Sequence, residues 1–173
     1  MSDTRPTDPF SGINDPMMIE VGVGEYAIAR HPHYLMTPAL GSCVAVALYD
    51  PVHKRGALAH VMLPAPPEHF DSTTGDRFAS IVVPGMVREL SKSGSSRARL
   101  VAKIAGGAAM FRPDTGLARI GDRNVAEVKR QLALVKIPIL AEDIGERHAR
   151  TVELRLDSGV FVVRSYAFGV TKL

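Results

Sequence analysis

The chain has little cysteine and no long apolar run, and each shortage excludes a class of protein. Cys43 is the one cysteine among the 173 residues, so the chain cannot form an internal disulfide and its thiol is free for chemistry. The longest uncharged stretch, residues 34–49, is too short to span a bilayer. The first ten residues lack the apolar core of a signal peptide. We therefore expect a cytoplasmic protein that does not insert into membranes.

Excess charge of one sign is also scarce. The net charge of +3 is too small to indicate a protein that binds nucleic acid. Basic side chains do dominate one segment, where the only acidic residue is Glu89; they are Arg88, Lys92, Arg97, Arg99, Lys103 and Arg112. They form either a solvated face or a surface that steers the chain toward an acidic partner.

Length and composition predict one folded domain. An apolar content of 46% with 23% charged residues is ordinary for a soluble globular protein of this size. Residues 1–16 combine three prolines with small polar residues, which predicts a disordered lead-in. We expect residues 17–173 to form a single domain.

Apolar spacing predicts two principal helices, at about residues 76–92 and 122–135. Pro84 should kink or divide the first helix, and Asp122 or Asn124 is a candidate N-cap for the second. Alternating segments predict strands, several of them joined by hairpins, such as residues 151–156 with 160–165. Because strands outnumber helices, the pattern favours an α+β fold.

The stretch from Thr37 to His60 contains the features that point to chemistry. Two apolar runs, residues 44–49 and 56–63, predict a hairpin with a loop at residues 50–53. That register pairs Tyr49 with Lys54, and so places Cys43 directly opposite His60 with Cβ atoms roughly 5 Å apart. A thiol needs a nearby base or cation to become a thiolate. The register therefore predicts a thiol–imidazole pair.

Five motifs in order resemble the chemoreceptor glutamine deamidase family, CheD. They are LGSCVAVALYD, GALAHVMLP, KIAGGAAMF, IGDRN and IPILAEDIG. The resemblance covers roughly residues 20–165, and Cys43 and His60 stand at the family's spacing. One departure follows the last motif, where residues 146–150 read ERHAR and members often carry a second glycine.

The resemblance implies an enzyme that converts selected glutamine side chains of chemoreceptor cytoplasmic helices to glutamate. It implies Cys43 and His60 as catalytic residues, and Thr37, six residues before the cysteine, as a third. It also implies an α/β sandwich, because the family is similar in fold to a bacterial toxin domain that deamidates glutamine. Gly106 and Gly107 are implied to shape the site. We expect no cofactor and no metal, a monomer when alone, and a CheC-type phosphatase as a possible partner.

The chemistry can be followed from the residue types. A Cys43 thiolate would attack the γ-carboxamide carbon to give an oxyanion and then a thioester. His60, as an imidazolium partner, would hold the thiolate, protonate departing ammonia and activate the hydrolytic water. Thr37 would orient the imidazole. Backbone amides around Gly41, Ser42 and Cys43 are candidates for the oxyanion hole.

Two alternatives stay open from the sequence. In the first, Cys43 serves another thiol hydrolase reaction, on receptor methyl esters or on a small amide. In the second, the protein is a non-catalytic binding partner of the CheC-type phosphatase in chemotaxis. Modification of receptor fragments in vitro would separate these from a deamidase.

Overall fold

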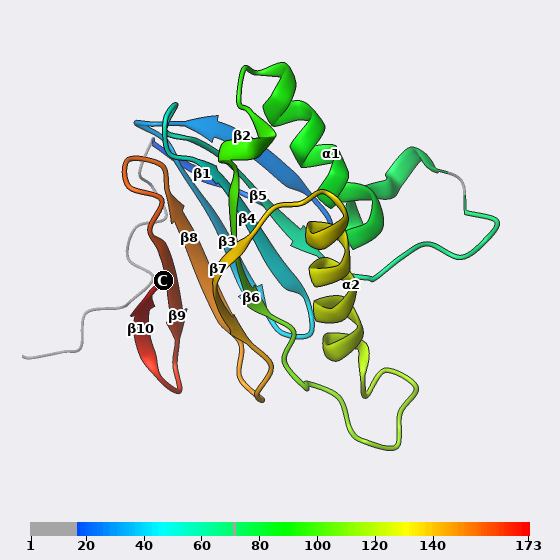
Figure 1. The fold of residues 1–173 in the computed structure, drawn as a ribbon. Helices are drawn as coiled ribbons and strands as arrows, with labels where there is room; N and C mark the ends of the chain where they lie inside the picture. The colour runs from blue at the N-terminus through cyan, green and yellow to red at the C-terminus, as the bar shows by residue number, and fades with distance from the viewer. Residues whose placement is uncertain (1–16, 71) are drawn as a thin grey trace, which may run out of the picture.

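The computed structural model describes residues 17–70 and 72–173. The lead-in predicted for residues 1–16 lies outside the described residues, and the single domain over 17–173 stays a prediction. Two five-stranded sheets stack face to face, and two helices cover the far face of one of them (Figure 1). We call the sheet that lies under the helices the central sheet and the other the outer sheet. This layering is an α+β sandwich, as the sequence predicts.

Each sheet is mostly antiparallel, with one parallel pair. The central sheet has the order β2 (Tyr26–Arg30), β5 (Arg55–Val61), β4 (Val44–Asp50), β6 (Val101–Gly106) and β7 (Ile139–Ile144). The outer sheet has the order β1 (Met18–Glu20), β3 (Tyr34–Leu40), β8 (Arg150–Arg155), β9 (Phe161–Ser165) and β10 (Gly169–Lys172).

Both predicted helices are confirmed, with shifted ends. They are α1 (Ala79–Lys92) and α2 (Ile120–Leu134); two short 3-10 helices, η1 (Ser72–Arg77) and η2 (Arg97–Arg99), flank α1. The prediction that Pro84 could divide the first helix is wrong, because α1 runs through it unbroken. Buried side chains on both sides of the proline, including Val83 and Met86, pack on the central sheet, and this packing outweighs the lost backbone hydrogen bond.

Strand β4 is buried on both faces, which explains its continuous apolar sequence. Val44, Val46 and Leu48 join the core beneath the helices. The alternate residues Ala45, Ala47 and Tyr49 join a second core between the two sheets. The side-chain period of two therefore assigns each residue of β4 to one of two cores.

The predicted β4–β5 hairpin exists, but its register is wrong by one position in each strand. Asp50 pairs with Arg55, so the four-residue loop is 51–54. The Asp50 carboxylate accepts hydrogen bonds from Val52 N at 3.0 Å and His53 Nδ1 at 2.9 Å. These contacts fix the turn after Asp50 and make it the last residue of the strand. The second predicted hairpin is present as β8 and β9, with Gly159 at φ +76° in its turn.

Candidate active site

Thr37, Cys43 and His60 lie at the interface between the two sheets. Thr37 belongs to β3 of the outer sheet, His60 belongs to β5 of the central sheet, and Cys43 immediately precedes β4. Thr37 is 0% exposed and His60 is 1% exposed, whereas Cys43 is half-buried. The fold therefore brings the three sequence-predicted residues to one interface, and of the three only Cys43 is in partial contact with solvent.

The hairpin register places Ala45, not Cys43, directly opposite His60. The predicted direct pairing is therefore wrong, because the loop spans residues 51–54 and not 50–53. This moves the pairing by one residue in each strand. Cys43 is two residues from Ala45, and both pack on the core between the sheets. Cys43 and His60 thus share a face as a diagonal pair, for which regular sheet geometry places the two residues about 7 Å apart.

A chain of hydrogen bonds fixes the protonation pattern of His60. Thr37 Oγ1 lies 2.6 Å from Val21 O, which can only accept, so the hydroxyl donates there. A hydroxyl has one proton. At its other contact, 2.7 Å from His60 Nδ1, the Thr37 oxygen must therefore accept, and Nδ1 must bear the hydrogen. For a neutral imidazole, Nε2 is then the nitrogen with the free lone pair.

The Nε2 atom of His60 is buried and has no hydrogen-bond partner among the described residues. An unpaired buried nitrogen is costly in a folded protein. An unpaired buried group in a native structure needs an explanation, and a catalytic role is one of those known. Nε2 is therefore the group in this interface that is available as a base.

The segment that follows β1 supports His60 in a way that the sequence did not predict. Val21 supplies the carbonyl that ends the Thr37 chain. Gly24 N donates to His60 O at 3.0 Å, and His60 N donates to Glu25 O at 2.9 Å. Here the chain crosses from the outer to the central sheet. Because these contacts use backbone atoms, no side-chain pattern could have revealed them.

The loop before β4 is held by its carbonyl groups. Gly41 O accepts from Ala108 N at 2.9 Å, and Cys43 O accepts from Gly107 N at 2.7 Å. Gly106 has φ +109°, and a Cβ atom added to it would lie 2.3 Å from Cys43 O. Only glycine allows this approach. Gly106 and Gly107 therefore constrain the backbone around Cys43, and the site-shaping role that the family resemblance implies for them stays a prediction.

Asn124 is a residue of this site that sequence reasoning misassigned. The predicted N-cap role of Asp122 or Asn124 is wrong, because α2 begins at Ile120 with Arg119 as N-cap. Asn124 instead lies inside the helix, is 0% exposed, and donates from Nδ2 to Ser42 O at 3.0 Å and Met62 O at 2.9 Å. The available signal was a polar residue on the apolar face of the helix, four residues before buried Val128.

Burial disfavours the charged form of both groups. It raises the pKa of the Cys43 thiol and lowers the pKa of His60 to about 4. In the free protein at neutral pH the pair is therefore a thiol and a neutral imidazole. The thiolate–imidazolium pair expected from sequence is disfavoured, because both ions would lose solvation.

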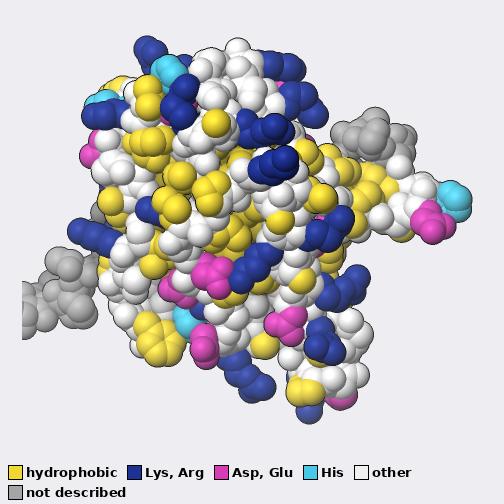
Figure 2. Space-filling model, viewed as in Figure 1, with side chains coloured by type: hydrophobic (Ala, Val, Ile, Leu, Met, Phe, Trp, Pro, Cys, Tyr) yellow, Lys and Arg dark blue, Asp and Glu magenta, His cyan; other side chains and the backbone are white. Residues whose placement is uncertain are grey.

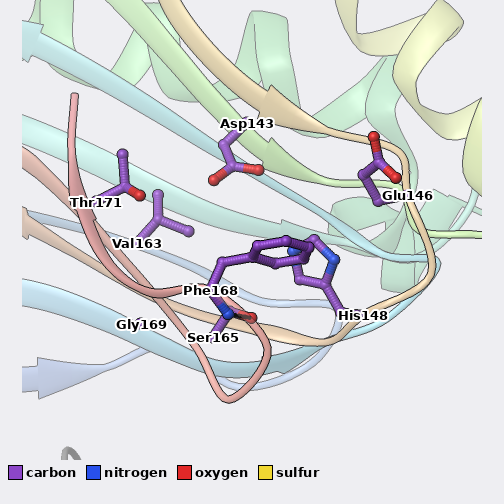
Figure 3. A pocket seen from close by; sticks show the side chains of 8 residues that line it. All are labelled: Asp143, Glu146, His148, Val163, Ser165, Phe168, Gly169 and Thr171. Atoms are coloured by element: carbon purple, nitrogen blue, oxygen red, sulfur yellow. Dashed lines mark hydrogen bonds between the residues drawn. The ribbon is translucent and has the colours of Figure 1, made fainter.

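A separate hollow of about 510 Å³ lies beside β7, β9 and β10, as Figure 3 shows. Its lining includes Glu146 and His148 from the segment that departs from the family pattern, and the His148 ring lies 4.6 Å from that of Phe168. None of Thr37, Cys43 and His60 lines it. Glu146 contacts the segment after β6 through its backbone: its carbonyl oxygen accepts a hydrogen bond from Ala109 N at 2.8 Å.

The basic residues of the segment 88–112 do not form one surface. Lys103 turns inward and donates from Nζ to Gly159 O at 2.9 Å and Leu173 O at 2.8 Å. Basic side chains gather at the end of the molecule where α1 stops (Figure 2). Asp50, at that end of β4, contacts Arg99, and the seven residues of β4 put it about 20 Å from Cys43. The basic end is thus remote from the thiol.

Over residues 17–70 and 72–173, no cluster of three or more His, Cys, Asp or Glu side chains is arranged to hold a metal ion. None of the helices within these ranges is long and apolar enough to cross a membrane.

Comparison with known proteins finds similarity to one family, CheD. A family model described as CheD chemotactic sensory transduction matches residues 62–165. A protein of Thermotoga maritima named chemoreceptor glutamine deamidase CheD is 46% identical over 86% of this chain and 92% of its own. A protein of Moorella thermoacetica named probable chemoreceptor glutamine deamidase CheD is 41% identical over 90% of this chain and 95% of its own. Another in Geobacter sulfurreducens, named probable chemoreceptor glutamine deamidase CheD 3, is 45% identical over 86% and 93%.

The buried neutral imidazole predicts a specific pH dependence of stability. The pKa of His60 is about 4 in the folded protein, against 6.5 for an unperturbed histidine. The unfolded chain therefore takes up a proton first as the pH falls. The contribution of neutral His60 to the free energy of unfolding is full above about pH 6.5 and is lost progressively as the pH falls toward about 4.

We expect His60→Asn, which keeps an amide donor for Thr37, to lose less stability than the wild type on acidification over this range. Urea unfolding at the two ends of the range should show a difference between the proteins of more than about 1 kcal/mol. His69→Asn, at an exposed histidine, is the matched control and should keep the wild-type dependence. Equal slopes for His60→Asn and the wild type would contradict a buried neutral imidazole.

Proposed function

Because the chain belongs to the CheD family, we propose that it is a cysteine-dependent protein-glutamine glutaminase that deamidates chemoreceptors. Selected glutamine side chains of the receptors' cytoplasmic helices are converted to glutamate, with release of ammonia. The observation that carries the proposal is the chain from His60 Nδ1 through Thr37 Oγ1 to Val21 O. It leaves a bare, buried Nε2 on the same face of the central sheet as the single thiol.

The first step is general-base activation of the thiol. Since burial raises the pKa of Cys43 and lowers that of His60, the thiolate forms when substrate is attacked. The thiol proton passes to His60 Nε2 as Sγ bonds to the γ-carboxamide carbon. Rotation of the Cys43 side chain about its χ1 angle changes the distance between Sγ and the imidazole. The carbonyl oxygen of the substrate becomes an oxyanion.

Two backbone amides can receive that oxyanion. Within the described part of the chain, neither Ser42 N nor Cys43 N donates a hydrogen bond. Free donors beside a nucleophile stabilise the charge that develops on the tetrahedral intermediate. We assign the oxyanion hole to these two amides, with Gly41 allowing the close backbone approach.

Collapse of the intermediate releases ammonia and leaves a thioester. The proton on His60 Nε2 moves to the departing nitrogen, which restores the neutral imidazole. Nε2 then removes a proton from water, whose oxygen attacks the thioester carbon. Breakage of the C–S bond returns the proton to Cys43 and yields the glutamate side chain. The net reaction consumes one amide and one water, and the three side chains end as they began.

The remaining proposals concern setting and partners. We infer that residues 17–173 act as one domain in the cytoplasm, without a cofactor or metal. The substrate is the helical cytoplasmic region of a chemoreceptor, and a CheC-type phosphatase is the proposed protein partner.

We predict that Cys43→Ala and His60→Ala stay folded and lose nearly all turnover on receptor cytoplasmic fragments. Loss of the nucleophile should lower kcat/KM by at least about a thousandfold. Loss of the base should lower it by about a hundredfold or more. Mass spectrometry of the fragments detects replacement of the amide NH2 by OH.

Val52→Ala, at an exposed position in the loop between β4 and β5, is the control and should keep full activity. Unmodified fragments after incubation with folded wild-type protein would overturn the proposed function. Release of methanol from methylated fragments by that protein would favour the esterase alternative. Full activity of Cys43→Ala would rule out the cysteine mechanism.

For Thr37 we predict that the hydroxyl matters more than the shape. Thr37→Val keeps the branched side chain but removes both contacts of Oγ1, so His60 loses its fixed tautomer. We expect kcat to fall about 10- to 100-fold, which is less than for Cys43→Ala. Thr37→Ser keeps the hydroxyl and should stay within about threefold of the wild type in the same receptor assay. If Val and Ser variants were equally active, the orienting role of Thr37 would be wrong.

A further inference from the structure

Asn124 is the buried polar side chain that joins the loop containing the nucleophile to the strand containing His60. Its Nδ2 atom donates to Ser42 O, in the residue directly before Cys43, at 3.0 Å. The same nitrogen donates to Met62 O, two residues after His60, at 2.9 Å. One amide group from α2 thus bridges the backbone on both sides of the candidate site.

The orientation of this amide is set by its surroundings. Both contacts are with carbonyl oxygens, so a reversed amide would place Oδ1 against two acceptors. In the observed orientation Oδ1 is buried and has no hydrogen-bond partner among the described residues. An unpaired buried acceptor is costly, and sites that retain such a group commonly have a functional reason. Here the orientation that leaves Oδ1 unpaired is the one in which Nδ2 bridges the two carbonyl groups.

The bridge decides where the Cys43 amide points. The peptide between Ser42 and Cys43 is trans, because the only cis peptide among the described residues is His31–Pro32. In a trans peptide the C=O and N–H bonds point in opposite directions. With Ser42 O held toward α2 by Asn124, Cys43 N–H points away from the helix. It has no acceptor within the described residues.

We propose that Asn124 is a positioning residue for the oxyanion hole. It fixes the Ser42–Cys43 peptide so that Cys43 N–H faces the substrate's carbonyl oxygen, and it holds this peptide at a constant distance from the strand that contains His60. This inference rests on the proposed deamidase function. It adds to Thr37, Cys43 and His60 the requirement that the Ser42–Cys43 peptide be held in one orientation.

The test compares Asn124→Leu, which keeps the size but removes both donors, with Asn124→Ser, whose hydroxyl can reach at most one carbonyl. Gln131→Leu is the matched control, since Gln131 is also buried on α2 but bonds to Glu127 and not to the loop. Each variant is assayed for kcat and KM on receptor fragments, and for its folded fraction by urea unfolding.

A second readout separates the oxyanion hole from the thiol. Cys43 is the only cysteine, so modification by methyl methanethiosulfonate reports on that thiol alone. This reagent has no carbonyl group and needs no oxyanion hole. We expect Asn124→Leu to lower kcat by about 10- to 100-fold, with KM and the thiosulfonate rate within about threefold of the wild type. Asn124→Ser should fall between the wild type and Asn124→Leu, and Gln131→Leu should match the wild type.

The outcomes distinguish a failure of the proposed function from a failure of the positioning role of Asn124. Wild-type protein that does not deamidate would overturn the proposed function itself. With active wild type, unchanged kcat in the folded fraction of either Asn124 variant would overturn the positioning role. Parallel losses in kcat and in the thiosulfonate rate would also overturn it, because the loop would then be disordered as a whole. If Asn124→Leu does not fold, the Asn124→Ser comparison decides by the same criteria.

Discussion

The hydrogen bond between Thr37 Oγ1 and His60 Nδ1 is the interaction on which the account of this protein depends. It joins the outer sheet to the central sheet inside the sandwich, where both side chains are buried. Since the Thr37 hydroxyl donates its hydrogen bond to Val21 O, a single threonine determines which nitrogen of His60 is protonated. With the hydrogen on Nδ1, the free lone pair of the neutral ring is at Nε2. A threonine can do this without introducing a buried charge, which an aspartate in the same position would require.

The same burial explains why the resting site is neutral. A thiolate and an imidazolium both lose solvation between the sheets, and their pKa values move in the directions that oppose ionisation. In the proposed mechanism, activation is linked to substrate: the proton moves when the thiol attacks an amide whose developing charge is stabilised by backbone donors. A cysteine that stays protonated until substrate binds is also less exposed to oxidation, because the thiolate is the reactive form.

The sequence predicted most of the fold, and the errors have specific causes. The two helices, the hairpins and the sandwich followed from apolar periodicity and from the family motifs. The β4–β5 register was wrong because Asp50 forms its own turn contacts, and the loop therefore starts one residue later. That error moved Cys43 from a direct to a diagonal position, but a matching shift in both strands left it on the same face as His60. Pro84 did not divide α1, because packing on both sides of it outweighs the missing donor.

The candidate site was predictable at its side chains and not at its backbone. Cys43, His60 and Thr37 were found from motifs, whereas Val21 contributes only a carbonyl, for which any residue type would serve. Asn124 can be recognised in the sequence from its place on the apolar face of the helix, four residues before Val128. A polar residue near a helix start also fits an N-cap, and only the start of α2 at Ile120 excludes that role.

The most direct test of the account is the protonation state of His60 at neutral pH. A long-range ¹H–¹⁵N correlation spectrum of the wild-type protein, with His60→Asn to assign the signals, reports on both ring nitrogens. We predict a neutral ring with its proton on Nδ1 and a bare Nε2. A proton on Nε2, whether in the other tautomer or in an imidazolium, would contradict it.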